Sequence, residues 1–451
     1  MANRIVMHID MNSYFASCEQ QDNLAWRGKP IGVCEHLGGI IIAPSIEAKQ
    51  WGIKTAMPVW EARKLYPKII LTPTNPDRYR KYTAKFLKVL SDYTDQIEKY
   101  SIDEAFVDLT KATNILKPNG KGGLMSVDPY SEAVLIAREI KRRITKEVGD
   151  WLKCSVGIAW NKLVAKIGSD MEKPNGLVVL RPEDKAMLYE KLKLTDIPGI
   201  AHRMQRRLND LGIRTLLDLK NYPGSELVRQ FGIMGYHLHQ MGQLEGSWKE
   251  NFAGTEDEPI KSMGHVYTIP QEFRKQNVLQ PVLYILSEMV GRRLRASNLM
   301  GNIVSVYTHD SHSNYFGKSR KLGYFLNDGR DIFLEAISIL SPLLSKYART
   351  NFNSRMVGVT VAGLASNVHQ QSLFKFYEKK KRLVAAMDKI NEKYEDFTPQ
   401  HFGKSQSGAG FTIARVPAFL ARDIIRDSVG FGRMKEFTRA PVFNKTNAIK
   451  K

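Results

Sequence analysis

Cysteine is scarce in this sequence, with only Cys18, Cys34 and Cys154 among 451 residues. Three thiols so far apart are too few for a disulfide framework or a cysteine-based zinc site, so we expect reduced thiols in a cytoplasmic protein. Long apolar runs are also missing: none approaches the roughly 18 residues of a membrane-spanning helix. Arg4 is followed by only a short apolar stretch and not by a signal core. The sequence therefore predicts a protein that does not enter a membrane.

Acidic residues are fewer than basic ones. The chain has 46 Asp and Glu against 67 Lys and Arg, a formal net charge of +21. An excess of this size favours a polyanionic partner, most simply nucleic acid. A merely basic soluble protein is one alternative, and an anionic membrane is a weaker one because no basic amphipathic anchor stands out. With 43% hydrophobic residues, the chain is long enough for about three domains with cores of their own.

Carboxylates interrupt two apolar, strand-like runs. Asp10 ends the run Ile5–Ile9, and Asp103 and Glu104 stand side by side within Tyr100–Asp108. Burying carboxylates is costly unless a cation lies beside them, and neighbours on a strand converge on one object only where the strand bends, as at a hairpin. A solvated turn or edge is the alternative for the pair taken alone. Three acids on two buried strands would suit a hard cation such as Mg²⁺.

The pattern of elements changes along the chain. Up to about residue 170, short apolar runs mix with helical stretches, as in an α/β or α+β unit. Helices and turns follow, and Leu194–Ile200 with the basic helix expected over Met204–Leu211 looks like a helix-hairpin-helix, whose turn amides face a DNA phosphate. Ala201 stands where the usual hairpin carries a second glycine. The hydrophilic stretch Glu245–Pro259 is interpreted as a linker, and strands alternate with helices again beyond it.

Four segments resemble the motifs of Y-family, lesion-bypass DNA polymerases. They stand in the family's order and are Asp10–Glu19, Glu47–Pro58, Tyr100–Asp108 and Ala159–Gly176. The resemblance continues to about residue 400, and the bacterial polymerase IV and polymerase V branches are the most similar. It implies a template-directed, low-fidelity polymerase that adds dNTPs to a primer 3′-hydroxyl during translesion synthesis.

The resemblance also implies an α+β multidomain fold shaped as a right hand. Its parts are a palm, fingers, a helical thumb with the helix-hairpin-helix, and a βαβββαβ-like little finger. The expected boundaries are 1–12 and 77–170 for the palm, 13–76 for the fingers, 171–244 for the thumb, 245–259 for the linker, 260–368 for the little finger, and 369–451 for a clamp-binding peptide and basic tail.

By the same resemblance, the catalytic carboxylates are Asp10, Asp103 and Glu104. With the backbone carbonyl of Met11 they are expected to hold two Mg²⁺ ions. Asp10 and Asp103 would bridge both ions, and Glu104 would serve the ion beside the primer terminus. Because like charges so close repel each other, we expect the site to be empty or disordered without metal.

Several further positions match residues that contact the nucleotide. Phe15 matches the steric gate, whose ring fills the space that a ribose 2′-hydroxyl needs; a core aromatic at a helix start is the plain alternative. Lys49, Tyr79 and Lys166 match positions that contact the dNTP triphosphate, and surface lysines are the alternative for the two cations. Lys49 stands where polymerase IV usually has arginine, so a point charge replaces a bidentate fork. Asp108 is expected to be structural.

The remaining expectations concern partners. Gln370, Leu373 and Phe374 resemble a sliding-clamp peptide, in which a Leu-Phe pair plugs an apolar pocket; an ordinary amphipathic turn is the alternative. The backbone amides of Gly199 and Ala201 are expected at a DNA phosphate. We therefore expect primer-template DNA, dNTPs and a sliding clamp as partners of a monomeric catalytic chain.

Two other classes of function remain as alternatives. One is a non-catalytic DNA-damage scaffold that keeps the fold, against which the intact Asp10, Asp103, Glu104 and Lys166 argue. The other is a palm-fold nucleotidyl or diguanylate cyclase. That alternative leaves the hairpin helices, Phe15 and the little finger unexplained.

Overall fold

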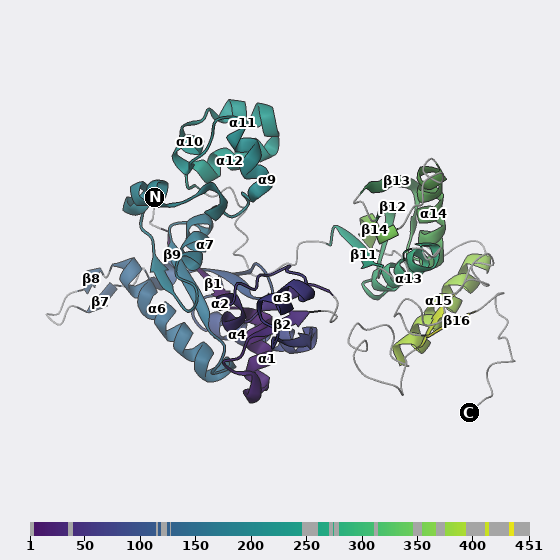
Figure 1. Ribbon diagram of the computed structural model, residues 1–451, viewed down its shortest axis with the longest axis horizontal. Helices are drawn as coiled ribbons and strands as arrows, with labels where there is room; N and C mark the ends of the chain where they lie inside the picture. Colours follow the sequence, from purple (N-terminus) through teal and green to yellow (C-terminus); the bar gives the residue numbers. More distant parts are fainter. Residues whose placement is uncertain are drawn as a thin grey trace. The chain divides into compact units, whose positions relative to one another are not determined.

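The structure is a computed structural model that divides the chain into two compact units, Met1–Glu256 and Asp257–Lys451 (Figure 1). Each unit is described by itself. Of the stretch 245–259 expected to be a linker, only residue 245 is described. The described residues are 4–34, 39–113, 116–118, 124–126, 128–245, 260–269, 274, 279–310, 314–345, 354–366, 375–393, 411–414 and 433–436.

A five-stranded sheet with the order β10-β9-β1-β6-β5 forms the centre of the first unit. Its strands are β1 (Val6–Met11), β5 (Ile97–Lys99), β6 (Glu104–Asp108), β9 (Cys154–Ala159) and β10 (Leu177–Val179). The middle strand β1 runs antiparallel to both of its neighbours and is buried along its whole length. Strand β10 belongs to this sheet although it falls within 171–244, the range expected for the thumb.

The two faces of this sheet are covered by different helices. Odd-numbered residues of β1 join one hydrophobic core with α1 (Tyr14–Asp22), α4 (Pro76–Ser91) and α6 (Pro129–Arg143), whereas Val6 joins a second core with α7 (Lys162–Met171). Side chains alternate across a strand, so Asp10 lies on the side of α7. Gly157 lets α7 approach closely, since a Cβ there would lie 2.0 Å from the carbonyl oxygen of Ala165.

A smaller sheet with the order β3-β2-β4 builds the fingers around a core of its own. Its strands and helices are β2 (Ile31–Cys34), β3 (Ile41–Pro44), β4 (Ile70–Pro73), α2 (Ile46–Gln50) and α3 (Val59–Leu65). The other elements of this part of the chain are the 3₁₀ helix Leu24–Trp26, α5 (Thr110–Thr113), β7 (Leu116–Pro118), β8 (Leu124–Ser126) and the π-helical turn Ile144–Val148.

Short helices form the thumb and share a core with α7. They are α8 (Lys185–Lys191), α9 (His202–Asn209), α10 (Leu216–Asn221), α11 (Gly224–Phe231) and α12 (Ile233–Gly242), with 3₁₀ turns at Pro182–Asp184 and Leu194–Asp196. The basic helix expected over Met204–Leu211 is present as α9 and begins two residues earlier.

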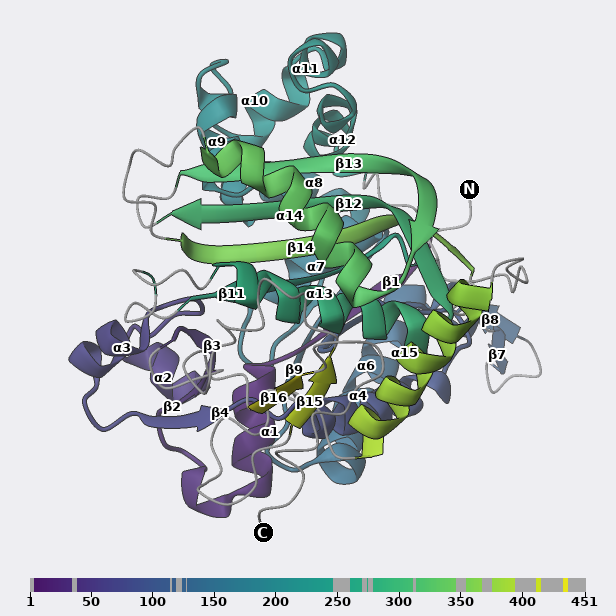
Figure 2. The ribbon, with the colours of Figure 1, turned by 90° about the vertical axis from the view of Figure 1, so that its right-hand side faces the viewer.

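The second unit is built on a four-stranded sheet with the order β11-β14-β12-β13. Helices α13 and α14 lie on one face of this sheet (Figure 2). The elements are β11 (Ser262–Thr268), α13 (Leu279–Ala296), β12 (Leu299–Asp310), β13 (Tyr315–Leu326), α14 (Gly329–Ser345), β14 (Ser354–Ser366), α15 (Lys375–Lys393), β15 (Phe411–Ala414) and β16 (Arg433–Glu436). In the described residues the order up to β14 is therefore βαββαβ, one strand fewer than the βαβββαβ-like order expected.

The structure describes the state of the cysteines and the apolar character of the helices. All three cysteines are free and buried. Across the described ranges, no helix has the length and apolar character needed to cross a membrane.

Candidate active site

Two carboxylates meet where neighbouring strands of the large sheet end and begin. Asp10 near the end of β1 pairs directly with Glu104, the first residue of β6. Asp103 comes one residue earlier, in the bend between β5 and β6, and its carbonyl oxygen accepts from the backbone N–H of Met11 at 3.0 Å. The adjacent carboxylates therefore stand at a hairpin bend, as their sequence pattern predicts.

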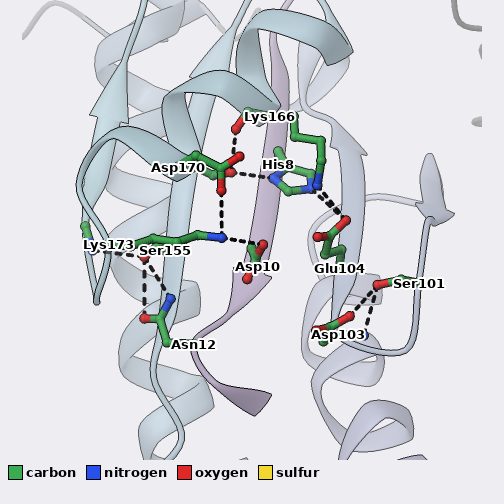
Figure 3. Close-up of polar contacts among 12 residues, drawn as sticks. His8, Asp10, Asn12, Ser101, Asp103, Glu104, Ser155, Lys166, Asp170 and Lys173 are labelled. Carbon is green, nitrogen blue, oxygen red and sulfur yellow. Dashed lines mark hydrogen bonds and ion pairs between the residues drawn. The ribbon is translucent and has the colours of Figure 1, made fainter. Parts of the chain in front are cut away.

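A lysine neutralises each of the two paired carboxylates (Figure 3). The ammonium of Lys173 lies 2.7 Å from Asp10 Oδ2, and that of Lys166 lies 2.7 Å from Glu104 Oε2. Lys173 also contacts Asp170 at 2.7 Å. The two ammonium groups offset the repulsion that was expected between the carboxylates.

Lys173 is the residue that the sequence analysis missed. Lys166 and Asp170 are four residues apart on one face of α7, and Lys173 follows Asp170 by three residues, in the turn after the helix ends at Met171. That spacing could have indicated a second cation beside Lys166.

The two paired carboxyl groups have opposite pKa shifts. Burial raises the pKa of Asp10 to about 6, although Lys173 lowers it, and the nearby Glu104 and Asp103 add to the rise. Burial also acts upward on the pKa of Glu104, but Lys166, which donates to Glu104 Oε2 at 2.7 Å, outweighs burial and holds that pKa at about 2. Ionisation of Asp10 in the folded protein is therefore unfavourable, and a bound cation would stabilise ionised Asp10 more than ionised Glu104.

His8 lies beside Glu104 and is fully buried. Its Nδ1 is 2.7 Å from the hydroxyl of Ser169, which itself donates to the carbonyl oxygen of Lys166 at 2.8 Å. Because the Ser169 hydroxyl donates its proton to that carbonyl oxygen, His8 Nδ1 must carry a proton and donate to the oxygen of Ser169. His8 Nε2 is 3.7 Å from Glu104 Oε2, which is too long for a hydrogen bond. Burial lowers the pKa of His8.

Asp103 has a hydrogen-bond partner of its own. Its carboxylate accepts a hydrogen bond from the hydroxyl of Ser101 (Figure 3). Within the described part of the chain, no three histidine, cysteine, aspartate or glutamate side chains form a ready-made metal cluster. The donor set still fits a hard cation such as Mg²⁺, since carboxylate and carbonyl oxygens are its preferred ligands and lysine ammonium groups already occupy cationic positions at two of the acids.

Phe15 and Tyr79 form one aromatic pair. Their rings stack with centroids 4.2 Å apart and planes 11° apart. Tyr79 is 1% exposed and its hydroxyl donates to Glu19 at 2.8 Å. The ring of Tyr79 supports Phe15, which is partly exposed, and a contact of Tyr79 with the dNTP triphosphate stays a prediction.

Lys49 belongs to the same electrostatic environment although it comes from α2 of the fingers. Burial lowers its pKa, nearby Lys173 lowers it further, and Asp10 raises it. The structure thus brings Lys49, Lys166 and Lys173 toward the carboxylates. Asp108 is structural, as expected, since it accepts from Arg4 Nε at 2.9 Å.

The thumb places the hairpin residues on its surface. Gly199 has φ of 101°, a left-handed conformation that favours glycine, and it is exposed together with Ala201, the residue before α9. Arg203 and Arg206 are exposed on α9 nearby in sequence. The clamp-peptide residues Gln370, Leu373 and Phe374 lie outside the described residues.

Models of known protein families match three parts of the chain. A model described as the impB/mucB/samB family matches residues 9–170, and the model of that family's C-terminal domain matches 260–373. A model described as the thumb domain of DNA polymerase-iota matches 195–243.

Relatives cover nearly the whole chain. The chain is 32% identical over 410 residues to DNA polymerase IV of Moorella thermoacetica, covering 90% of this chain and 97% of the relative. It is 31% identical over 409 residues to DNA polymerase IV 1 of Bacillus subtilis, covering 87% and 91%. Among solved structures it is similar to a Y-family DNA polymerase chimera of Dbh and Dpo4, with a TM-score of 0.67, 28% identity, and coverage of 80% of this chain and 100% of the chimera. The chain therefore belongs to the Y-family of DNA polymerases, the DNA-directed polymerases of translesion synthesis.

Proposed function

We propose that Asp10, Asp103 and Glu104, with the carbonyl of Met11, hold two Mg²⁺ ions, and that the site transfers a nucleotide from a dNTP to a primer 3′-hydroxyl. The observation that carries the proposal is the direct pairing of Asp10 with Glu104, each neutralised by a lysine at 2.7 Å. When bound, the ions would activate the attacking oxygen and stabilise charge on the leaving pyrophosphate.

The lysines bind the anionic substrate in this proposal. A cation at Asp10 would take over the neutralising role of Lys173, whose ammonium is then free to bind phosphate oxygens. Lys166 and Lys49 add positive charge on the same side. Fixed ammonium groups in a partly buried site stabilise the triphosphate without solvent reorganisation. Asp10 must be ionised to bind a cation, and its raised pKa places this requirement near pH 6.

Phe15 acts as the steric gate in this proposal, and Tyr79 keeps its ring in place by stacking at 4.2 Å. Replacing Phe15 by alanine would open the space for a ribose 2′-hydroxyl. We expect F15A to raise the rate of rNTP incorporation relative to dNTP incorporation, measured with each nucleotide in single-turnover primer extension. An unchanged ratio of rNTP to dNTP incorporation would contradict the assignment of Phe15 as the steric gate.

Binding partners outside the carboxylate site complete the proposal. The exposed amides at Gly199 and Ala201 would bind a phosphate of primer-template DNA, supported by the positive charge of α9. Gln370, Leu373 and Phe374 would bind a sliding clamp. We propose that the catalytic chain acts as a cytoplasmic monomer.

Primer extension with Mg²⁺ tests the carboxylate site directly. We expect D103N to lose about 100-fold or more in extension rate, because one charge that stabilises the transition state is removed. D108N is the matched control: it removes a carboxylate from the same hairpin at a position paired with Arg4, and extension should persist. A wild-type chain that binds primer-template DNA without extending it would support the scaffold alternative and defeat the polymerase site.

A further inference from the structure

Lys173, the cation at Asp10, belongs to the turn that joins the end of α7 to the start of β10. Its ammonium contacts Asp10 and also Asp170, the residue three positions earlier. Lysine carries its charge on a flexible four-carbon stem, and 35% of this side chain is exposed. These two contacts alone therefore do not fix where the backbone of Lys173 lies. The position of the ammonium depends on what holds the turn.

Asn12 ties this turn to the strand that carries Asp10. The backbone N–H of Asn175 donates to Asn12 Oδ1 at 2.7 Å, and Asn12 Nδ2 donates to the hydroxyl of Ser155 at 3.0 Å (Figure 3). Both side chains are buried, and Ser155 is the residue of β9 that pairs with Asp10 of β1. Because Asn12 comes two residues after Asp10, one short segment holds both the carboxylate and the turn of its lysine.

Lys141 of α6 holds the same turn through a separate set of contacts. Its ammonium donates to the carbonyl oxygens of Asn175 at 2.7 Å, Gly176 at 2.9 Å and Cys154 at 2.9 Å. An ammonium group has three N–H donors, and backbone oxygens use all three here. Two of these oxygens belong to the turn and the third to β9. Lys141 therefore fastens the turn to the large sheet.

The backbone of the turn is closed tightly. A Cβ at Gly176 would lie 2.0 Å from the carbonyl oxygen of Glu172, so the chain folds back onto the residue that follows α7. Asn175 has φ of 60°, in the left-handed region that asparagine enters more readily than most residues. The N–H of Gly176 also donates to Ser155 at 3.3 Å. A displacement of this closed backbone would therefore be passed on to Lys173.

We propose that Asn12 and Lys141 are positioning residues that hold the Lys173 ammonium at the carboxylate site. Both act through the backbone of the turn. Their effect on nucleotide binding rests on the function proposed above for Lys173, the binding of phosphate oxygens of the dNTP. An ammonium that is held in place beforehand does not have to be ordered when the nucleotide arrives, so the nucleotide binds more tightly.

The first experiment measures whether the Lys173 ammonium is held without any nucleotide. An amine-reactive ester is added to the full-length chain in EDTA, and the modification rate of each lysine is read by mass spectrometry. Lys173 should react slowly in the wild type, because two carboxylates bind its ammonium. We expect N12L and K141M each to raise the modification rate of Lys173 about 3-fold or more. The rate of the exposed Lys68 should not change, which shows that the variants remain folded.

The second experiment measures the nucleotide step by single-turnover primer extension. K173A should raise the Kd for dNTP about 10-fold or more, because a charged hydrogen-bond donor to the triphosphate is lost. N12L and K141M should raise the same Kd about 3-fold or more with an unchanged reaction amplitude. Neither should add to the loss in the K173A background. A loss of folded protein would instead lower the amplitude and leave the Kd as it is.

N12D and K153M are the matched variants. N12D keeps an oxygen for the N–H of Asn175, so its Kd for dNTP should stay closer to that of the wild type than the Kd of N12L does. K153M removes a lysine whose ammonium donates to the carbonyl oxygen of Asp150, outside the turn. It should match the wild type in both experiments.

Unchanged modification of Lys173 in both N12L and K141M would overturn the proposal. A rise in the Kd for dNTP that is as large in the K173A background as in the wild type would overturn it as well, because the effect would not pass through Lys173. If both variants release Lys173 but K173A binds dNTP as tightly as the wild type, the positioning role is confirmed and the proposed contact of Lys173 with the triphosphate is wrong.

Discussion

At the residue scale, the distinctive feature is that a bound cation could replace Lys173 as the partner of Asp10. The carboxylate is 7% exposed and is bound by Lys173 at 2.7 Å. Removing a buried carboxylate from water disfavours its charge more than this lysine compensates, which is why its pKa is raised. The same imbalance makes a cation at this position favourable.

This imbalance predicts a pH dependence of stability in the absence of metal. The pKa of Asp10 is about 6 in the folded chain against an ordinary value of 3.8. The folded state therefore binds more protons than the unfolded state between these values, and the free energy of unfolding should fall as pH rises through that window. The decrease from this one group is at most about 3 kcal/mol.

Urea unfolding in EDTA at several pH values between about 4.5 and 7 measures this effect. D10N cannot ionise and should give a flatter profile in that window. Glu104 does not disturb the comparison there, because its pKa is lowered and its stabilising contribution is lost only on acidification toward pH 2. Profiles of identical slope in D10N and the wild type would contradict the prediction.

At the scale of elements, the geometry of the carboxylate site depends on how α7 and the β5–β6 hairpin pack against β1. Gly157 removes the side chain that would keep α7 away from the sheet, and this close approach brings Lys166 to Glu104. The hairpin bend separates Asp103 from Glu104, so the two adjacent acids have different partners. The sequence predicted the acids and the bend from charge and apolar patterning. The partner of Asp103, Ser101, is local, whereas the pairing of Glu104 with Lys166 depended on packing between segments 62 residues apart.

Helix α15 shows how a segment beyond the matched family domains is attached to the second unit. Asp388 accepts from Arg295 Nε and Nη2 at 2.6 and 2.7 Å, and Lys380 pairs with Asp328 at 3.3 Å. Val384 and Met387 are buried between these contacts. The helix is thus held by apolar packing flanked by ion pairs, and it was expected only as part of a basic tail.

We predict that D388A loosens α15. The bidentate pair is partly buried, with 16% and 20% of the two side chains exposed, so its loss should cost about 1–3 kcal/mol locally. Hydrogen exchange of the α15 amides should become faster by a corresponding factor. E139A, which removes an exposed helical ion pair of the first unit, should leave exchange in α15 unchanged. Equal protection of α15 in D388A and the wild type would contradict the role of the pair.

At the scale of the whole molecule, the net charge of +21 favours binding to the anionic phosphates of DNA. Binding that neutralises phosphates releases condensed counterions, so affinity must fall as salt is raised. We expect the affinity for primer-template DNA to fall more than about 10-fold between roughly 50 and 200 mM salt. Anisotropy titrations at several salt concentrations measure the slope.

The hairpin helix provides the comparison for this prediction. R203A/R206A removes two exposed charges beside Gly199 and Ala201 and should make the slope shallower by about 2 units if each arginine contacts a phosphate. R229A is a control, since Arg229 is already paired with Glu226. An affinity independent of salt would show that charge does not drive DNA binding.

The sequence by itself determined the family and predicted Asp10, Asp103, Glu104 and Phe15 as site residues, because motif spacing and alternation along a strand are local properties of the chain. Only the tertiary structure decided that Lys173 neutralises Asp10, that Tyr79 is buried behind Phe15, and that β10 joins the large sheet. These features arise from contacts between segments distant in sequence, and such contacts follow from packing and burial, which no local pattern encodes.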